Sequence, residues 1–219
     1  GAQNRAEAEE LVEKNLVSVG LDMSTVQGKY TNQFSGGELQ RISIARALIP
    51  QPKLIIADEP VSMIDASLRM NIVNLFLELK EKREVSFLYI THDLSTAYYV
   101  SDDIAIMYRG NVIEYGPSDR IMTDPRHPYT ELLMESVPKV GEKWDKNVAL
   151  PDVEIAEYDI QACKFAARCP YARDICRAHK PPVVDVGDDR WALCFKPVDY
   201  SLDYVPASQA DREGTKGEE

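Results

Sequence analysis

The stretch Phe34-Ser35-Gly36-Gly37-Glu38 combines residue types that can hold a phosphate group. A serine hydroxyl can donate a hydrogen bond to an anion, and two glycines let backbone N–H groups approach it closely. A helix expected to begin near Glu38 would direct the positive end of its dipole to the same place. Taken alone, the pattern is equally that of an ordinary helix start that contains glycine, so its meaning depends on the residues that follow.

Two adjacent carboxylates, Asp58 and Glu59, follow the apolar run 54–57. Such a run predicts a strand buried in a parallel sheet. Because open α/β sheets bind ligands at the carboxyl ends of their strands, acids placed there could divide the work of nucleotide hydrolysis. In that interpretation Asp58 holds Mg²⁺ and Glu59 polarises the attacking water. The alternative is a pair of solvated acids at a strand end.

A histidine closes the next apolar segment, because the expected strand 85–90 runs into Thr91-His92-Asp93. If the two strands are parallel, the imidazole of His92 reaches the same edge and could bond the γ-phosphate of a nucleotide. A lone histidine is more often simply a polar group with a satisfied hydrogen bond.

Between the two expected strands, the residues from Ser62 to Asp65 precede an amphipathic helix. One face of that helix carries Leu68, Ile72, Leu75, Phe76 and Leu79, and its end is charged. One interpretation of Asp65 is that it is simply the N-cap of this helix.

These four motifs, in this order, resemble the signature, Walker B, D-loop and switch-histidine motifs of ATP-binding cassette (ABC) ATPases; Ile64 departs from the leucine usual in the D-loop. The resemblance implies an α/β fold with a helical subdomain and ATP with Mg²⁺ as ligands. It implies that Ser35, Gly36, Gly37 and Glu38 contact the ATP of a partner subunit in trans and that Asp65 lies at the dimer interface. Asp58 would hold Mg²⁺, and Glu59 and His92 would be catalytic.

The phosphate-binding loop of that family does not occur in these 219 residues, which contain no Gly-x-x-x-x-Gly-Lys-Ser/Thr sequence. Ahead of the signature stands only an amphipathic helix that Gly20 is expected to end. We therefore expect an incomplete nucleotide-binding core from which about half a cassette is missing. We also expect that the 219-residue chain alone has no appreciable ATPase activity.

The C-terminal half contains a second distinctive motif after an expected hairpin, 103–115. His127-Pro128-Tyr129 begins a short helix, with proline suited to its first turn. In this position the tripeptide resembles the C-terminal extension of oligopeptide and dipeptide importer ATPases. This resemblance implies uptake of peptides, or of oligosaccharides that related importers carry.

The same resemblance implies a set of partners. They are a second ABC ATPase subunit, most simply in a heterodimer, two integral membrane permease subunits and, indirectly, an extracytoplasmic substrate-binding protein. The chain would then lie at the cytoplasmic face of the cell membrane. No apolar stretch approaches the length of a membrane-spanning helix, which needs about 20 residues. The net charge of −11 argues against nucleic acid as a partner.

All four cysteines, Cys163, Cys169, Cys176 and Cys194, lie in the expected extension. Disulfides suit a reducing compartment poorly, and no tight Cys-x-x-Cys pair favours zinc. A [4Fe–4S] cluster needs four thiolates on looser loops, often beside a proline such as Pro170. Similar cysteines hold such a cluster in some peptide-importer ATPases. The cluster is the favoured interpretation, with free thiols and zinc as alternatives.

These segments predict four regions. They are a helical subdomain with the signature (1–50), the C-terminal part of an ABC core (51–118), a cysteine-containing extension (119–205) and a disordered tail (206–219). A connector of low regularity is expected at 139–157. Two other functions remain open: a soluble ABC-type ATPase that acts on nucleic acid, and a non-enzymatic iron–sulfur or interaction module.

Overall fold

The two apolar runs on either side of the amphipathic helix pair as parallel strands in the computed structural model. This model describes residues 4–62, 64–136 and 160–196. Strand β1 (Leu54–Asp58) pairs along its whole length with β2 (Ser86–Ile90). By its contacts the chain divides into two compact units, residues 1–101 and 102–219.

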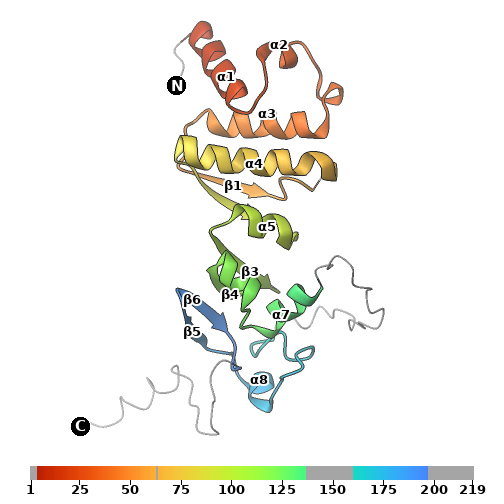
Figure 1. Cartoon of the computed structure of the whole chain (residues 1–219), viewed down its shortest axis with the longest axis vertical. Helices are drawn as coiled ribbons and strands as arrows, with labels where there is room; N and C mark the ends of the chain where they lie inside the picture. Colours follow the sequence, from red (N-terminus) through yellow and green to blue (C-terminus); the bar gives the residue numbers. More distant parts are fainter. Residues whose placement is uncertain (1–3, 63, 137–159, 197–219) are drawn as a thin grey trace, which may run out of the picture. The chain divides into compact units, whose positions relative to one another are not determined.

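In the first unit, helices pack on one face of this sheet, and α3 (Gly36–Leu48) and α4 (Ala66–Arg83) run side by side in Figure 1. Helix α1 (Arg5–Ser18) packs on α3 and ends before Gly20, whose φ of +72° suits glycine. The short elements are α2 (Met23–Val26), the 3₁₀ turn η1 (Thr31–Gln33) and α5 (Leu94–Val100). The prediction that the first helix ends at Gly20 is thus confirmed.

The core of this unit is built by the apolar stripe of α4 together with residues of α1 and α3. Ile72, Phe76 and Leu79 are almost fully buried, as the helical periodicity predicts. Leu68, on the same face of the helix, is 43% exposed. Leu68 lies in the first turn of α4, and the buried part of the stripe begins one turn later, at Ile72.

The strands are covered on one face only within the described residues. Ile55, Ala57, Phe87 and Tyr89 pack against the helical core, whereas alternate residues point away from it. Ile56 and Leu88, on that other face, are 63% and 51% exposed. The prediction that the strands are parallel is confirmed, and the prediction that they are buried holds for one face.

The second unit is built on an antiparallel sheet with the strand order β3-β4-β6-β5. The expected hairpin is confirmed as β3 (Asp103–Tyr108) and β4 (Asn111–Pro117). Strand β4 also pairs with β6 (Arg190–Leu193), which pairs in turn with β5 (Val183–Gly187). The sheet therefore joins residues far apart in sequence, such as Glu114 and Ala192, which lie opposite each other.

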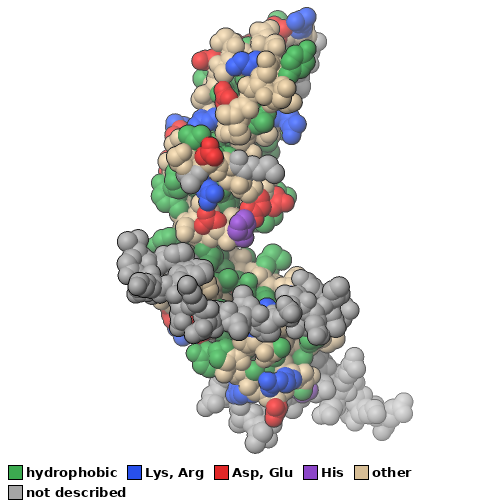
Figure 2. All heavy atoms as spheres, turned by 90° about the vertical axis from the view of Figure 1, so that its right-hand side faces the viewer, with side chains coloured by type: hydrophobic (Ala, Val, Ile, Leu, Met, Phe, Trp, Pro, Cys, Tyr) green, Lys and Arg blue, Asp and Glu red, His purple; other side chains and the backbone are tan. Residues whose placement is uncertain are grey.

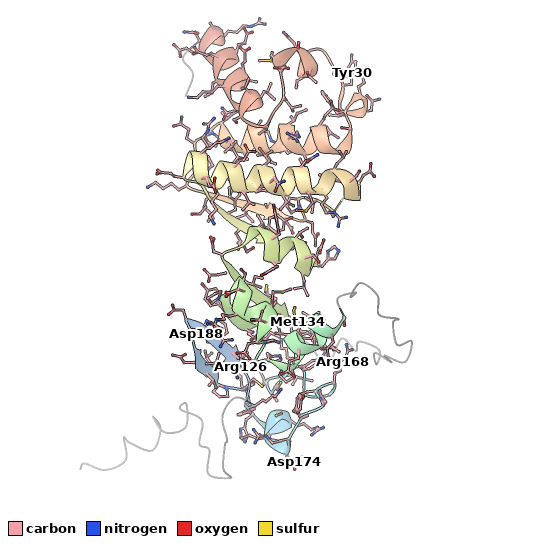
Figure 3. All side chains as sticks on the ribbon, viewed as in Figure 1. Tyr30, Arg126, Met134, Arg168, Asp174 and Asp188 are labelled. Atoms are coloured by element: carbon pink, nitrogen blue, oxygen red, sulfur yellow. The ribbon has the colours of Figure 1, made fainter. Side chains whose placement is uncertain are left out.

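Three short helices complete the second unit: α6 (Ser118–Thr123), α7 (Pro128–Glu135) and α8 (Asp174–Ala178). Figure 3 labels Arg126 just ahead of α7, Asp174 at the start of α8 and Asp188 in the turn between β5 and β6. The expected connector at 139–157 and the tail at 206–219 lie outside the described residues. The predicted boundaries at 50, 118 and 205 stay predictions.

Candidate functional site

The parallel register of β1 and β2 brings their carboxyl ends to one edge. Asp58 lies opposite Ile90, and the backbone N–H of Glu59 donates to the Ile90 carbonyl at 2.9 Å. Asp58 is exposed at the last position of β1. Glu59 follows β1 directly and His92 comes two residues after the end of β2. The fold thus places an acid pair and an imidazole together.

Glu59 and His92 are in direct contact. The Nδ1 atom of His92 lies 2.6 Å from Oε1 of Glu59, and the histidine side chain is 82% exposed. An ionised carboxylate only accepts hydrogen bonds, so the proton of this contact belongs to Nδ1 of the imidazole. A neutral imidazole with its proton on Nδ1 has no N–H left on Nε2. Only the imidazolium form could bond Glu59 and an anion at the same time.

The backbone at Glu59 is strained, with a φ of +45° in the left-handed region. Its carbonyl accepts from the backbone N–H of Ser62 at 3.2 Å and from the Ser62 hydroxyl at 3.0 Å. A non-glycine residue in this region costs about 1–3 kcal/mol and is frequent at functional sites. The tight turn after β1 therefore holds the Glu59 carboxylate at the strand end.

Asp65 does not use its carboxylate to cap α4. It occupies the N-cap position without a side-chain capping bond, and its carbonyl accepts from the backbone N–H groups of Leu68 and Arg69. Its side chain is exposed. The N-cap alternative therefore does not account for the carboxylate of Asp65.

The Ser35 loop forms a capping box at the start of α3. The Ser35 hydroxyl accepts from the backbone N–H of Glu38 at 3.3 Å, and the Glu38 carboxylate accepts from the backbone N–H of Ser35 at 2.8 Å. These bonds to Ser35 hold the pKa of Glu38 below its usual value. The helix starts at Gly36, ahead of the expected Glu38, because this box closes its first turn.

Gly37 leaves the front of this loop open, since a Cβ atom built there would meet no atom within 4 Å. Ser35 and Gly36 are exposed. The loop can therefore both start the helix and face a nucleotide. Its contact with ATP stays a prediction.

A charged pair beside His92 was not anticipated from the sequence. Arg69, in the first turns of α4, places Nη1 3.2 Å from Oδ2 of Asp93. Asp93 also caps α5 by accepting from the backbone N–H groups of Ser95 and Thr96. An aspartate ahead of Leu-Ser-Thr signals a helix N-cap, but nothing in the sequence indicates that an arginine 24 positions earlier binds it.

The histidine of the His-Pro-Tyr motif has a structural position in the second unit. Nδ1 of His127 accepts from the backbone N–H of Tyr129 at 3.0 Å and so caps α7, with Pro128 in the first turn. Burial lowers the pKa of His127 to about 4, and the charge of Lys196 adds to the effect. A neutral imidazole is what this cap requires, because a protonated Nδ1 cannot accept.

The four cysteine side chains line one pocket of the second unit. They are not disulfide-bonded. The sulfur of Cys194 accepts from the backbone N–H of Lys196 at 3.3 Å and that of Cys176 from Arg173 at 3.5 Å. Burial raises the pKa of Cys163, Cys169 and Cys194, that of Cys194 to about 12.

This arrangement does not amount to a preformed metal cage. Among the residues that the structure describes, no group of three or more His, Cys, Asp or Glu side chains is placed to hold a metal ion. The predicted [4Fe–4S] cluster therefore has no preformed site among the described residues.

Aromatic and basic side chains line the pocket beside the thiols. Phe165, Tyr171 and Phe195 line the pocket together with Arg173. Trp191 does not line it; this ring stacks on Tyr115 on the β4–β6 ladder. The basic residue that the sequence reasoning missed is Lys196, which lines the pocket, bonds Glu131 and lies over the ring of Tyr171.

Two surface properties bear on partners. No helix in the described parts of the chain is long and apolar enough to cross a membrane. On the face drawn in Figure 2, lysine and arginine side chains are interspersed with acidic and apolar ones, in keeping with the net charge of −11. Among the described residues drawn there, basic side chains form no continuous surface of the kind that a nucleic-acid backbone requires.

Two families of known proteins match separate parts of the chain. Residues 2–62 match the family described as ABC transporter, and residues 113–176 match the C-terminal region of oligopeptide/dipeptide transporters. The first match covers the Ser35 loop and the acid pair. The second covers the His-Pro-Tyr motif and three of the four cysteines.

Individual relatives agree with these matches. The chain is 37% identical, over 87% of its length, to the oligopeptide transport ATP-binding protein OppF of Haemophilus influenzae, and covers 58% of that protein. It is 39% identical, over 78% of its length, to the dipeptide transport ATP-binding protein DppD of Escherichia coli, covering 52% of it. The chain thus spans between half and three fifths of the length of these relatives.

A solved structure shows the same fold. The ATP-binding cassette MJ1267 of an ABC transporter, in its ADP conformation, superposes on 61% of this chain with a TM-score of 0.52 and 28% identity, and the match covers 52% of MJ1267. The mixed α/β architecture expected from the motifs is therefore that of a solved cassette.

Proposed function

The chain belongs to the ATP-binding cassette ATPases of the oligopeptide/dipeptide transporter type, and on this premise we propose that it forms part of the subunit that couples ATP binding and hydrolysis to peptide uptake. The observation that carries the proposal is the contact between Glu59 and His92 at the sheet edge beside Asp58. Oligopeptides or dipeptides are the proposed cargo, with related oligosaccharides as the alternative.

The proposed division of work follows the chemistry of each side chain. Asp58 would hold Mg²⁺, which neutralises charge on the transferred phosphoryl group. Glu59 would accept a hydrogen bond from the attacking water and orient it. His92 would donate to the γ-phosphate, either as the imidazolium that keeps its bond to Glu59 or after turning away from that carboxylate.

We assign the Ser35 loop to a different nucleotide. Ser35, Gly36, Gly37 and Glu38 would contact the ATP held by a second ABC ATPase subunit, with Asp65 at the interface between the two. The open front of Gly37 and the exposed serine support this assignment. In this proposal the two ATPase subunits differ and bind two integral membrane permease subunits at the cytoplasmic face of the cell membrane. An extracytoplasmic substrate-binding protein acts indirectly.

The decisive experiment is ATP hydrolysis by the intact transporter that contains this subunit. Glu59→Gln keeps the shape of the side chain and removes the carboxylate charge, so we expect kcat to fall by about a hundredfold or more while ATP still binds. Glu78→Gln, which removes an exposed carboxylate of α4, is the matched control and should leave kcat unchanged. An unchanged rate in Glu59→Gln would overturn the assignment.

A second measurement concerns the 219-residue chain by itself. We expect no appreciable turnover, because the sequence contains no Gly-x-x-x-x-Gly-Lys-Ser/Thr loop to grip the β- and γ-phosphates. Robust Mg²⁺-dependent hydrolysis by this chain would show that the proposed division of the nucleotide site is wrong.

We further propose that the four cysteines bind a [4Fe–4S] cluster with a structural role. What supports it is that all four line one pocket and that their sulfurs accept backbone N–H bonds, an interaction that stabilises sulfur ligands. Iron and acid-labile sulfide in anaerobically purified protein, with a visible absorption band, are the expected result. Absence of both would return the cysteines to zinc, which metal analysis detects, or to free thiols.

The two alternative functions are less well supported. The named relatives are peptide transport proteins, and the acidic chain is poorly suited to a nucleic-acid backbone. A non-enzymatic module would have no need of the strained Glu59 beside His92. Salt-sensitive DNA binding by the intact protein would favour the first alternative.

A further inference from the structure

The ion pair between Arg69 and Asp93 connects two loops of the proposed catalytic site. The backbone N–H of Arg69 donates to the carbonyl of Asp65 at 3.0 Å, so the arginine belongs to the helical turn that begins at Asp65. Its Nη1 donates to Oδ2 of Asp93 at 3.2 Å. Asp93 follows His92 directly, and the pair therefore joins the start of α4 to the loop that carries the histidine.

Asp93 is held on several sides, which makes it a defined anchor. Its other carboxylate oxygen, Oδ1, accepts from the backbone N–H groups of Ser95 at 3.0 Å and Thr96 at 3.4 Å. Its own backbone N–H donates to the Thr91 hydroxyl at 3.1 Å. These bonds tie Asp93 to Thr91 on one side and to the start of α5 on the other. Because His92 lies between Thr91 and Asp93, the direction of its side chain depends on the position of Asp93.

The same neighbourhood includes the proposed catalytic glutamate. The phenol of Tyr89 lies within electrostatic reach of Glu59, Arg69 and Asp93. Desolvation by burial is the main cause that raises the pKa of Tyr89, and the charges of Asp93 and Glu59 raise it further while Arg69 opposes them. Tyr89 is therefore close to both carboxylates and to the arginine cation.

We infer that Arg69 is a positioning residue for ATP hydrolysis: it holds Asp93, and through it His92, in register with the Asp65 loop. This inference rests on the proposed function. If Asp65 meets the partner subunit, movement of its loop shifts the first turns of α4 and, through the ion pair, the loop of His92. Dimer contact and placement of the histidine are then linked by one pair of side chains.

We expect the pair to contribute little to folding. Both side chains are about a third exposed, at 33% and 28%, and ion pairs with access to water add little to stability. A change at Arg69 should therefore act on the rate of hydrolysis while the folded subunit persists. This separates a positioning role from a general structural one.

The test uses the intact transporter and three substitutions. Arg69→Gln removes the charge, Asp93→Asn removes it while an amide oxygen can still cap α5, and Arg69→Lys keeps a cation. We expect the first two to lower kcat between about tenfold and a hundredfold, as loss of alignment does, with little change in KM for ATP. Arg69→Lys should recover most of the rate. Lys82→Gln, which breaks an exposed pair with Glu78 on the same helix, is the matched control.

A further measurement separates positioning from a merely structural role: whether the loss of kcat in Arg69→Gln depends on the presence of His92. In a His92→Ala background, Arg69→Gln should cost little more, because coupled groups are not additive. Equal costs in both backgrounds, or an unchanged kcat in Arg69→Gln and Asp93→Asn, would overturn the inference. Absence of ATP hydrolysis by the unmodified transporter would instead overturn the proposed function, so the two failures are distinguishable.

Discussion

The buried carboxylate of Glu114 accepts the backbone N–H of His127 at 2.9 Å, while its second oxygen accepts that of Arg126 at 2.7 Å. Strand β4 thereby fixes the residues that lead into α7, and the neutral His127 then caps that helix. The His-Pro-Tyr tripeptide is thus a junction between a sheet and a helix.

Glu114→Gln should destabilise the second unit by about 1–3 kcal/mol, because an amide has one oxygen where two buried N–H groups need acceptors. Urea unfolding followed by tryptophan fluorescence would measure it, since Trp191 lies on the neighbouring strand. Glu135→Gln, an exposed residue at the end of α7, makes the same chemical change. Equal stabilities of these two variants would contradict the role given to Glu114.

A second prediction concerns acid. The pKa of His127 falls from 6.5 to about 4 on folding, so the unfolded chain binds the proton more readily. The stability that neutral His127 contributes is complete above about pH 6.5 and is lost as pH falls towards 4. The difference corresponds to about 3 kcal/mol.

His127→Asn tests this directly, because asparagine caps a helix without titrating in this range. Free energies of unfolding measured between pH 7 and 4 should fall less steeply for this variant than for the unmodified chain. Glu114 and Lys196 face the same region and are present in both proteins, so they cancel in the comparison. Parallel pH profiles would show that His127 does not control this loss.

How far the sequence predicts the structure depends on how local each signal is. The periodic stripe of α4, the two parallel strands and the meeting of Glu59 with His92 all follow from short apolar runs and their ends. Strand β5 was not predicted, because it is held only through β6, which pairs with a strand far away in sequence. The Arg69–Asp93 ion pair was not predicted for the same reason, because the sequence around a surface arginine of a helix does not indicate which distant residue it binds.

A third prediction follows from the close approach of β4 to Arg190. A Cβ atom on Gly116 would clash with the Arg190 side chain, which is only 3% exposed and bonded to Asp124 and to the Gly187 carbonyl. Gly116→Ala should therefore destabilise the second unit by about 1–3 kcal/mol. In an Arg190→Ala background the same change should cost clearly less. Equal cost in both backgrounds, measured by thermal unfolding, would rule out the clash.

The last prediction concerns the thiols in metal-free, reduced protein. Alkylation requires the thiolate, and burial raises the pKa of Cys194 to about 12. Cys169 is partly exposed. Burial is the main cause that raises its pKa, and the backbone hydrogen bond from Tyr171 and, to a smaller extent, the charge of Lys196 oppose this rise. At pH 8, iodoacetamide should therefore modify Cys169 well before Cys194, as peptide mass spectrometry would show. Denaturation in urea should abolish the difference, because it arises from burial; equal rates in the folded chain would contradict the pocket described for these thiols.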